Sequence, residues 1–212
     1  MAKKFSNKEA LRFSWEVTKA NLGFFISLFA GVLVIYLGFG VLQNFADRHS
    51  LLSLVVSLAD WFLQVMVSIG LLTIPLKFVD GQKADYGHLF SGYHHILRYF
   101  SASLLYMLIV LGGLVLLVVP GIIWAIRFQF FGYLIVDKNL GPIEALKRSW
   151  AITKGSVGEL FTFSLLLALI NLAGMLALMV GLFITVPISL LATAFVYRKL
   201  LGVSSQPATA TV

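Results

Sequence analysis

Uncharged apolar segments of membrane-spanning length constrain this chain more than any other feature of its sequence. A helix that crosses about 30 Å of hydrocarbon needs about 20 predominantly apolar residues. Residues 22–42 contain no charged side chain, and neither do residues 160–197. The second stretch is too long for one crossing, and Gly181 marks the expected turn within it. Such segments predict an all-α integral membrane protein.

The composition supports the same class of protein. Hydrophobic residues make up 59% of the chain and charged residues 12%, and the mean hydropathy is +0.95. Soluble domains are about 45–50% apolar and about 25% charged. This comparison excludes a water-soluble globular domain and a disordered chain. The absence of cysteine excludes disulfides and thiolate metal sites.

The same criteria predict six transmembrane helices in a single membrane domain over residues 1–201. These helices are expected at about 22–42, 51–76, 100–119, 122–136, 160–180 and 182–200. Pro120 and Gly121 form the expected turn between the third and fourth spans, because this pair breaks a helix. Residues 202–212 are small and polar and are expected to form a disordered tail.

The distribution of Lys and Arg predicts the orientation of the spans. With the N-terminus in the cytoplasm, fourteen of the sixteen Lys and Arg residues fall on the cytoplasmic side. Arg48 lies on the outer side and Arg127 lies within the fourth span. An odd number of crossings would abolish this asymmetry, so both chain ends are expected to be cytoplasmic. In an apolar chain a net charge of +7 favours a membrane surface over nucleic acid as the partner.

An eleven-residue motif occurs twice in the chain. Residues 9–19 and 144–154 share seven of eleven residues, at a constant offset of 135. At about 100° per residue, residues 144–154 place apolar and small side chains on one half of the helix and most charged side chains on the other. Helices of this kind lie in the membrane interface, with Trp at the headgroup boundary. We therefore expect cytoplasmic-side amphipathic helices at about 6–20 and 141–155, and a third at about 85–98.

Both copies of the motif precede a span from the same side, so they form a parallel internal repeat, with an axis along the membrane normal. The repeat serves either folding alone or a shared role in binding lipid or a partner. The residues expected to carry that role are Ser14, Trp15, Thr18, Lys19, Ser149, Trp150, Thr153 and Lys154.

Asp60 and Arg127 are charged side chains expected well inside spans, where a charge costs a few kcal/mol. At about 1.5 Å per residue, Asp60 lies about 13 Å beyond Leu51, and Arg127 lies about 10 Å beyond Pro120. Both therefore lie at a similar depth, and we expect an ion pair between them. The other members of this intramembrane polar layer are Gln64, Gln129 and Asn171. The layer is either a structural clamp or a site for an anionic headgroup or an ion.

A set of residues from Pro120 onward carries a family resemblance. The set comprises Pro120, Gly121, Ile122, Ile123, Arg127, Gly141, Pro142, Glu144, Ala145, Leu146, Ser149, Trp150, Thr153, Gly155, Gly181 and Pro187. It resembles uncharacterised bacterial inner-membrane proteins related to the membrane domain of some glycerophosphodiester phosphodiesterases. The resemblance implies a multi-pass inner-membrane protein. It implies no catalytic activity, because the phosphodiesterase chemistry of the two-part proteins belongs to a separate soluble barrel.

Motifs that would indicate an enzyme are missing from the sequence. It contains no glycine-rich phosphate-binding loop, no nucleophile elbow and no pair of carboxylates within one turn of a predicted span. His88, His94 and His95 lack the spacing of a helical metal site. We therefore expect no catalysis, no cofactor and no metal.

The expected function is to bind anionic membrane lipids, or a partner protein, through basic amphipathic helices and the polar layer. A small transporter or channel for an ion or anionic molecule is one alternative. An accessory subunit of a larger membrane complex is another, and a homo-oligomer is compatible with each of these functions.

Overall fold

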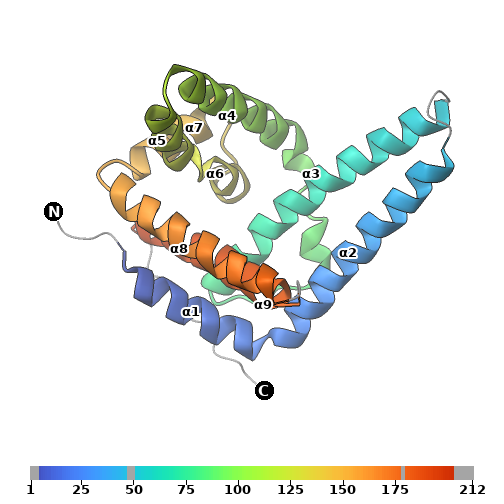
Figure 1. Ribbon diagram of the computed structural model, residues 1–212, viewed down its shortest axis with the longest axis horizontal. Helices are drawn as coiled ribbons and strands as arrows, with labels where there is room; N and C mark the ends of the chain where they lie inside the picture. The colour runs from blue at the N-terminus through green and yellow to red at the C-terminus, as the bar shows by residue number, and fades with distance from the viewer. Residues whose placement is uncertain (1–4, 47–50, 178–179, 203–212) are drawn as a thin grey trace.

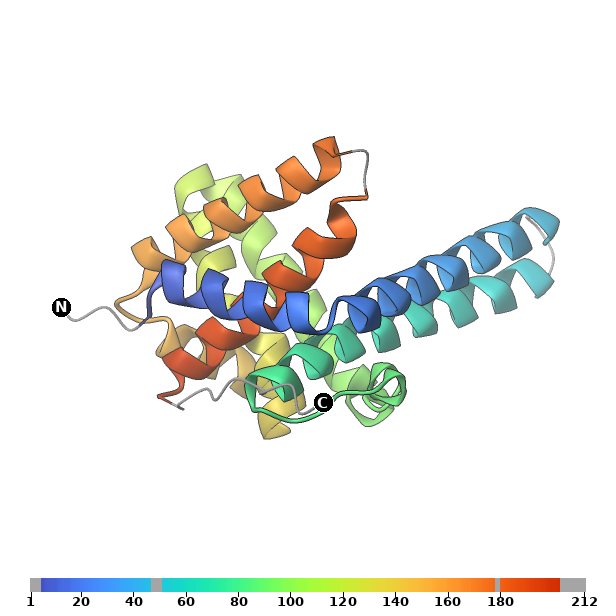
Figure 2. The same ribbon diagram turned by 90° about the horizontal axis from the view of Figure 1, so that it is seen from below.

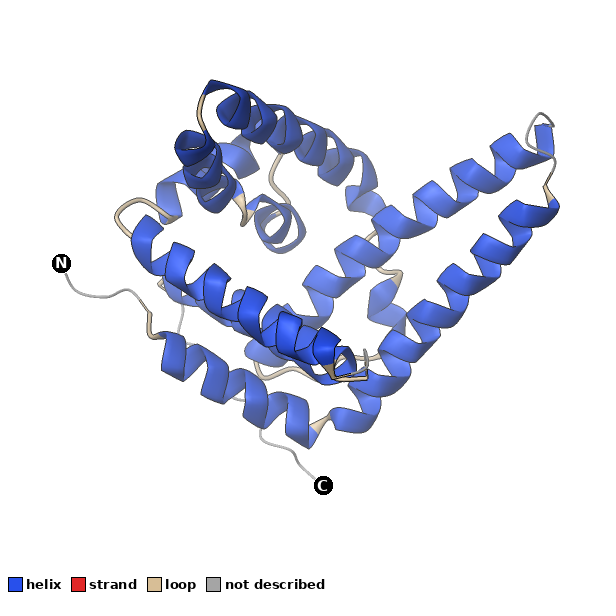
Figure 3. Ribbon diagram, in the orientation of Figure 1, coloured by secondary structure: helices blue, strands red, loops and turns tan. Residues whose placement is uncertain are grey.

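The computed structural model describes residues 5–46, 51–177 and 180–202, and the chain is all-α, with no strand in the described residues (Figure 3). The residues expected to form a disordered tail lie, apart from Gly202, outside the described residues. Figure 1 shows how the helices are arranged. Their bounds are α1 (Asn7–Ala20), α2 (Leu22–Phe45), α3 (Leu51–Val79), η1 (Tyr86–Leu89), η2 (Tyr93–His95), α4 (Ile96–Leu116), α5 (Val118–Phe128), α6 (Phe131–Lys138), α7 (Pro142–Ile152), α8 (Val157–Leu176) and α9 (Leu182–Leu200).

Six helical segments of the described chain are long and apolar enough to cross a membrane. They are Leu22–Phe45, Leu51–Val79, Tyr86–Leu116, Val118–Lys138, Val157–Leu176 and Leu182–Leu200. Large apolar side chains on these segments face outward, as helices in contact with lipid require; Phe45 is 82% exposed and Val115 is 86% exposed. The chain is therefore a polytopic membrane protein.

The long helices form hairpins that meet around α9. Helix α9 packs against α1, α3 and α8, and its residues Leu191 and Val196 are fully buried. The hairpin of α2 and α3 extends away from the rest of the molecule (Figure 2). The core is thus built at one end of this hairpin, where the buried residues Phe25 and Leu28 of α2 and Val67 and Ile74 of α3 lie.

The turn between α4 and α5 lies earlier in the chain than the sequence suggests. Leu117, with φ −166° and ψ 146°, separates the two helices, while Pro120 and Gly121 belong to the first turn of α5. Proline is tolerated there because the first N–H groups of a helix have no intrahelical partner. A Cβ on Gly113 would lie only 2.9 Å from the Cα of Gly121, so the paired glycines let the two helix backbones touch.

Two helices that the sequence predicts as continuous are interrupted in the structure. The fourth span, expected as one helix over 122–136, is divided between α5 and α6, with Gln129 and Phe130 between them. The third amphipathic helix, expected at about 85–98, is instead η1, η2 and the first turn of α4. Glycines at 87 and 92 interrupt this segment, which packs closely on α3: a Cβ on Gly70 would overlap the carbonyl oxygen of Leu89.

Candidate functional site

Helix α7 closes the break between α5 and α6. The Ser149 hydroxyl donates a hydrogen bond to the Arg127 carbonyl oxygen at 2.8 Å and accepts one from the Phe130 backbone N–H at 3.2 Å. The Thr153 hydroxyl also reaches the Arg127 carbonyl, at 3.2 Å. Because hydrocarbon offers no partner to free backbone groups, the Ser149 hydroxyl serves both backbone groups at a helix break within the candidate span Val118–Lys138.

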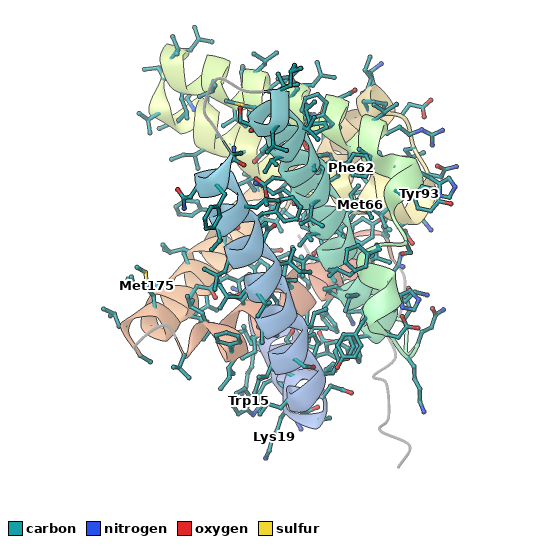
Figure 4. All side chains as sticks on the ribbon, turned by 90° about the vertical axis from the view of Figure 1, so that its right-hand side faces the viewer. Trp15, Lys19, Phe62, Met66, Tyr93 and Met175 are labelled. Atoms are coloured by element: carbon teal, nitrogen blue, oxygen red, sulfur yellow. The ribbon has the colours of Figure 1, made fainter. Side chains whose placement is uncertain are left out.

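The small polar residues of the repeated motif lie inside the protein rather than on its surface. Ser14 and Thr18 of α1, and Ser149 and Thr153 of α7, are all fully buried. The apolar half of each motif helix therefore packs largely on protein, whereas the sequence suggested that it contacts lipid. The outward residues are the tryptophans, with Trp15 50% exposed and Trp150 37% exposed, and the lysines. Figure 4 shows Trp15 and Lys19 of the first motif. The outward lysines are Lys19 and Lys154.

Arg127 stacks on the tryptophan of the second motif. Its Cζ lies 4.0 Å from the centroid of the Trp150 ring, and the Phe128 ring lies 5.2 Å from the same ring. No group within the described residues accepts a hydrogen bond from the Arg127 guanidinium, and its Nε is buried without a partner. A guanidinium carries five N–H donors, so this cation is available to an anion from outside the chain.

An apolar groove of about 530 Å³ opens beside this stacked pair. Its walls are formed by α4, α5 and α7, and the lining residues are Leu108, Ile109, Gly112, Leu116, Trp124, Phe128 and Trp150. A Cβ on Gly112 would meet nothing within 4 Å, so the missing side chain leaves the groove open at that point. The groove thus offers an apolar surface that ends at Trp150, on which Arg127 lies.

The predicted ion pair between Asp60 and Arg127 is not formed. The Asp60 carboxylate accepts a hydrogen bond from Gln64 Nε2 at 2.7 Å, and Arg127 lies on Trp150. The prediction was wrong because similar depth does not place two residues on facing helices. Gln129 and Asn171, which were also predicted in the polar layer, have other partners. Gln129 Nε2 donates to the Ile126 carbonyl, and Asn171 Nδ2 donates to Ser189.

A second ionic cluster joins the ends of α3, α6 and α9, and the sequence did not indicate it. Arg198, whose side chain is 7% exposed, donates to both carboxylate oxygens of Asp80 and to both of Asp137, at 2.6–2.9 Å. The Tyr197 hydroxyl donates to Asp137 at 2.9 Å. These residues lie far apart in the chain, so no local motif carries the signal. All their strong bonds are internal, which makes this cluster a structural clamp.

The described residues contain no group of three or more His, Asp or Glu side chains that could hold a metal ion. One of the three clustered histidines has a local role, because the His88 side chain and the Asp85 side chain form a capping box at the start of η1. The Arg127–Trp150 pair and its groove are therefore the candidate site.

Comparisons with known proteins show which family model and which relatives match this chain. A family model described as a domain of unknown function (DUF7847) matches residues 24–211. An uncharacterized protein of Mycobacterium bovis (Mb2590) is 31% identical over 133 residues, which are 63% of this chain and 41% of that protein. An uncharacterized protein of Mycobacterium tuberculosis (Rv2560) is 30% identical over 133 residues, which are again 63% of this chain and 41% of that protein.

The chain thus spans about two fifths of the length of these curated relatives. These matches carry no link to glycerophosphodiester phosphodiesterases. No solved structure matches the chain.

Proposed function

This chain belongs to the family described as a domain of unknown function (DUF7847), and from that premise we propose that it is a non-enzymatic, multi-pass protein of the bacterial inner membrane that holds an anionic phospholipid between α4, α5 and α7. The relationship to the membrane domains of glycerophosphodiester phosphodiesterases, suggested by the motifs from Pro120 onward, is part of the same proposal. The observation that carries the proposal is a guanidinium without an acceptor at the end of an apolar groove.

The charge of Arg127 supports an anionic ligand. Among the described residues no carboxylate lies within 4 Å of its guanidinium, and an uncompensated cation in a span is costly. A phosphate accepts two parallel hydrogen bonds from a guanidinium, which is the strongest pairing available to this side chain. Trp150 contacts the guanidinium through its ring, and the buried Nε has no hydrogen-bond acceptor among the described residues.

The groove supports a lipid as the source of that phosphate. Its lining is apolar, and a groove of about 530 Å³ accommodates a substantial part of an acyl chain. The acyl chain comes from lipid or detergent rather than from water, so the groove contributes van der Waals packing and not a hydrophobic transfer energy. Lys147 and Arg148 lie exposed on the same helix as Trp150, and each cation near an anionic leaflet adds about 1 kcal/mol of attraction.

The experiment is a lipid titration of the full chain in detergent, followed by native mass spectrometry. The probes are phosphatidylglycerol, phosphatidylcholine and inorganic phosphate. We expect phosphatidylglycerol to bind most tightly and inorganic phosphate to compete weakly, because it does not fill the groove. Arg127→Gln should weaken phosphatidylglycerol binding about 10-fold or more. The matched control Arg12→Gln, an exposed cation on α1 and away from the groove, should change it less than about 3-fold.

A second pair of variants tests the groove independently of charge. Gly112→Leu places a side chain in the groove, while Gly38→Leu places one on α2, where a Cβ also meets nothing within 4 Å. Both variants should fold, since leucine favours a helix more than glycine does. Only Gly112→Leu should weaken phosphatidylglycerol binding. Equal binding by all four variants and the wild type would disprove the proposal.

A further inference from the structure

One face of α3 is polar along the segment expected to cross the membrane. Its polar residues are separated by four, three, four and four positions, which places them on one side of a helix. They are Ser53, Ser57, Asp60, Gln64 and Ser68. Gln43 of α2 reaches the same face, where its Nε2 donates a hydrogen bond to Ser57 at 2.7 Å.

The charge on this face is not neutralised within the described residues. Asp60 accepts one hydrogen bond, from Gln64 to its Oδ2 oxygen, and no cation of the described chain lies within 4 Å of it. A carboxylate has about four acceptor sites, so Oδ1 retains its full capacity. Gln64 in turn keeps one amide N–H and its carbonyl oxygen.

The polar face lies on a hairpin that carries many exposed apolar side chains. The hairpin of α2 and α3 extends away from the body (Figures 1 and 2), and Leu37, Leu54 and Leu58 on it are each about 60% exposed. Lipid chains cover exposed leucines well, but they cannot form hydrogen bonds with a carboxylate or an amide. Exposure of this polar face to lipid alone would therefore cost several kcal/mol.

We propose that this face binds a second copy of the chain, with Asp60 and Gln64 of each copy hydrogen-bonded to Gln64 and Asp60 of the other. The face is complementary to itself, because it carries an unused acceptor and an unused donor one helical turn apart. A two-fold axis along the membrane normal then satisfies both copies at once. Hydrogen bonds of this kind between transmembrane helices stabilise their association.

An apolar notch of about 290 Å³ lies between α2 and the start of α9, and residues of those two helices line it. The proposed contact between the two copies does not use this notch. This inference is independent of the lipid site, which uses α4, α5 and α7.

The test is disulfide cross-linking in membranes, for which the natural absence of cysteine is ideal. Ser57→Cys puts a thiol on the polar face and leaves Asp60 and Gln64 in place. Phe62→Cys is the matched control, since a shift of five residues turns the thiol about 140° around the helix. Figure 4 shows Phe62 on the side of α3 nearer to Tyr93. An oxidant should give a covalent dimer with Ser57→Cys and little or none with Phe62→Cys.

Light scattering on the wild type and on Asp60→Leu, in mild detergent, gives a second readout that needs no cysteine. The wild type should be a dimer, and Asp60→Leu should weaken dimerisation about 3-fold to 10-fold. A monomeric wild type, or equal cross-linking at both positions, would overturn the proposal. Stoichiometric copurification of a different protein on this face, in place of a second copy, would overturn it too.

Discussion

Arg198 is the residue whose loss should cost the fold most. It is nearly buried and holds two carboxylates, Asp80 at 29% and Asp137 at 13% side-chain exposure. Removal of the cation leaves those carboxylates close together and without their strongest partner. The residue thus links three helix ends, two of which are also joined by the hydrogen bond from Tyr197 to Asp137.

Arg198→Met should therefore destabilise the protein by about 3–5 kcal/mol, which corresponds to a fall in Tm of about 10 °C in a thermal melt in detergent. The control is Arg12→Met, which removes the same cation from an exposed pair with Glu16 on α1. That variant should melt like the wild type. Equal melting of Arg198→Met and the wild type would show that the clamp is not needed.

The two serines of the repeated motif offer a matched pair for a second prediction. Ser149 bridges the break between α5 and α6, whereas the Ser14 hydroxyl bonds to the Ala10 carbonyl of its own helix. Ser149→Ala leaves the Phe130 N–H without an acceptor and should cost about 1–3 kcal/mol. Ser14→Ala should be close to neutral. Thermal melts of both variants check the difference, and equal costs would contradict the bridging role.

The sequence predicted these residues unevenly, for physical reasons. Arg127 and Trp150 were singled out, the first as a charge in an apolar segment and the second as a repeated tryptophan. Their contact could not be foreseen, because it depends on the break that brings α7 back alongside α6. Asp80 and Arg198 lie 118 positions apart, and each has the ordinary sequence context of a charged residue at the end of a span.

At the scale of elements, the apolar segments of about 20 residues were predictable, and the breaks between them were less so. Helices α2, α8 and α9 begin and end within five residues of the expected spans. The division between α5 and α6 escaped prediction, because its free backbone groups are satisfied by hydroxyls from a distant helix. The sequence predicted the two motif helices, which are α1 and α7. It did not predict that their small residues are buried, because that depends on which other helices pack against them.

The α4–α5 hairpin gives a prediction at this scale. A Cβ on Gly113 would lie 2.7 Å from the Trp124 ring and 2.9 Å from the Cα of Gly121, whereas one on the neighbouring Gly112 would meet nothing within 4 Å. Gly113→Ala should therefore cost about 1–3 kcal/mol through overpacking. Gly112→Ala should be neutral or stabilising by up to about 1 kcal/mol. Thermal melts that ranked the two variants in the opposite order would contradict the close contact of the helices.

At the scale of the whole molecule, the ionic contacts gather several helix ends at one place. Arg198 joins the ends of α3, α6 and α9, and Lys199 pairs with Glu9 at the start of α1 at 2.9 Å. The sequence predicted a cytoplasmic position for each of these ends from the distribution of Lys and Arg. The proposed lipid site depends on this arrangement, because it requires the basic edge of α7 to meet the anionic leaflet.

Single-cysteine labelling with a membrane-impermeant maleimide, in right-side-out vesicles, tests the six-span arrangement most directly. Substitutions at Phe45, Leu117 and Leu176, which lie at the hairpin turns, should be labelled before the vesicles are opened. Cysteines at Ser6 and Gln82 should be labelled only after the vesicles are opened. Labelling of Ser6→Cys and Gln82→Cys from opposite sides of the membrane would contradict the account.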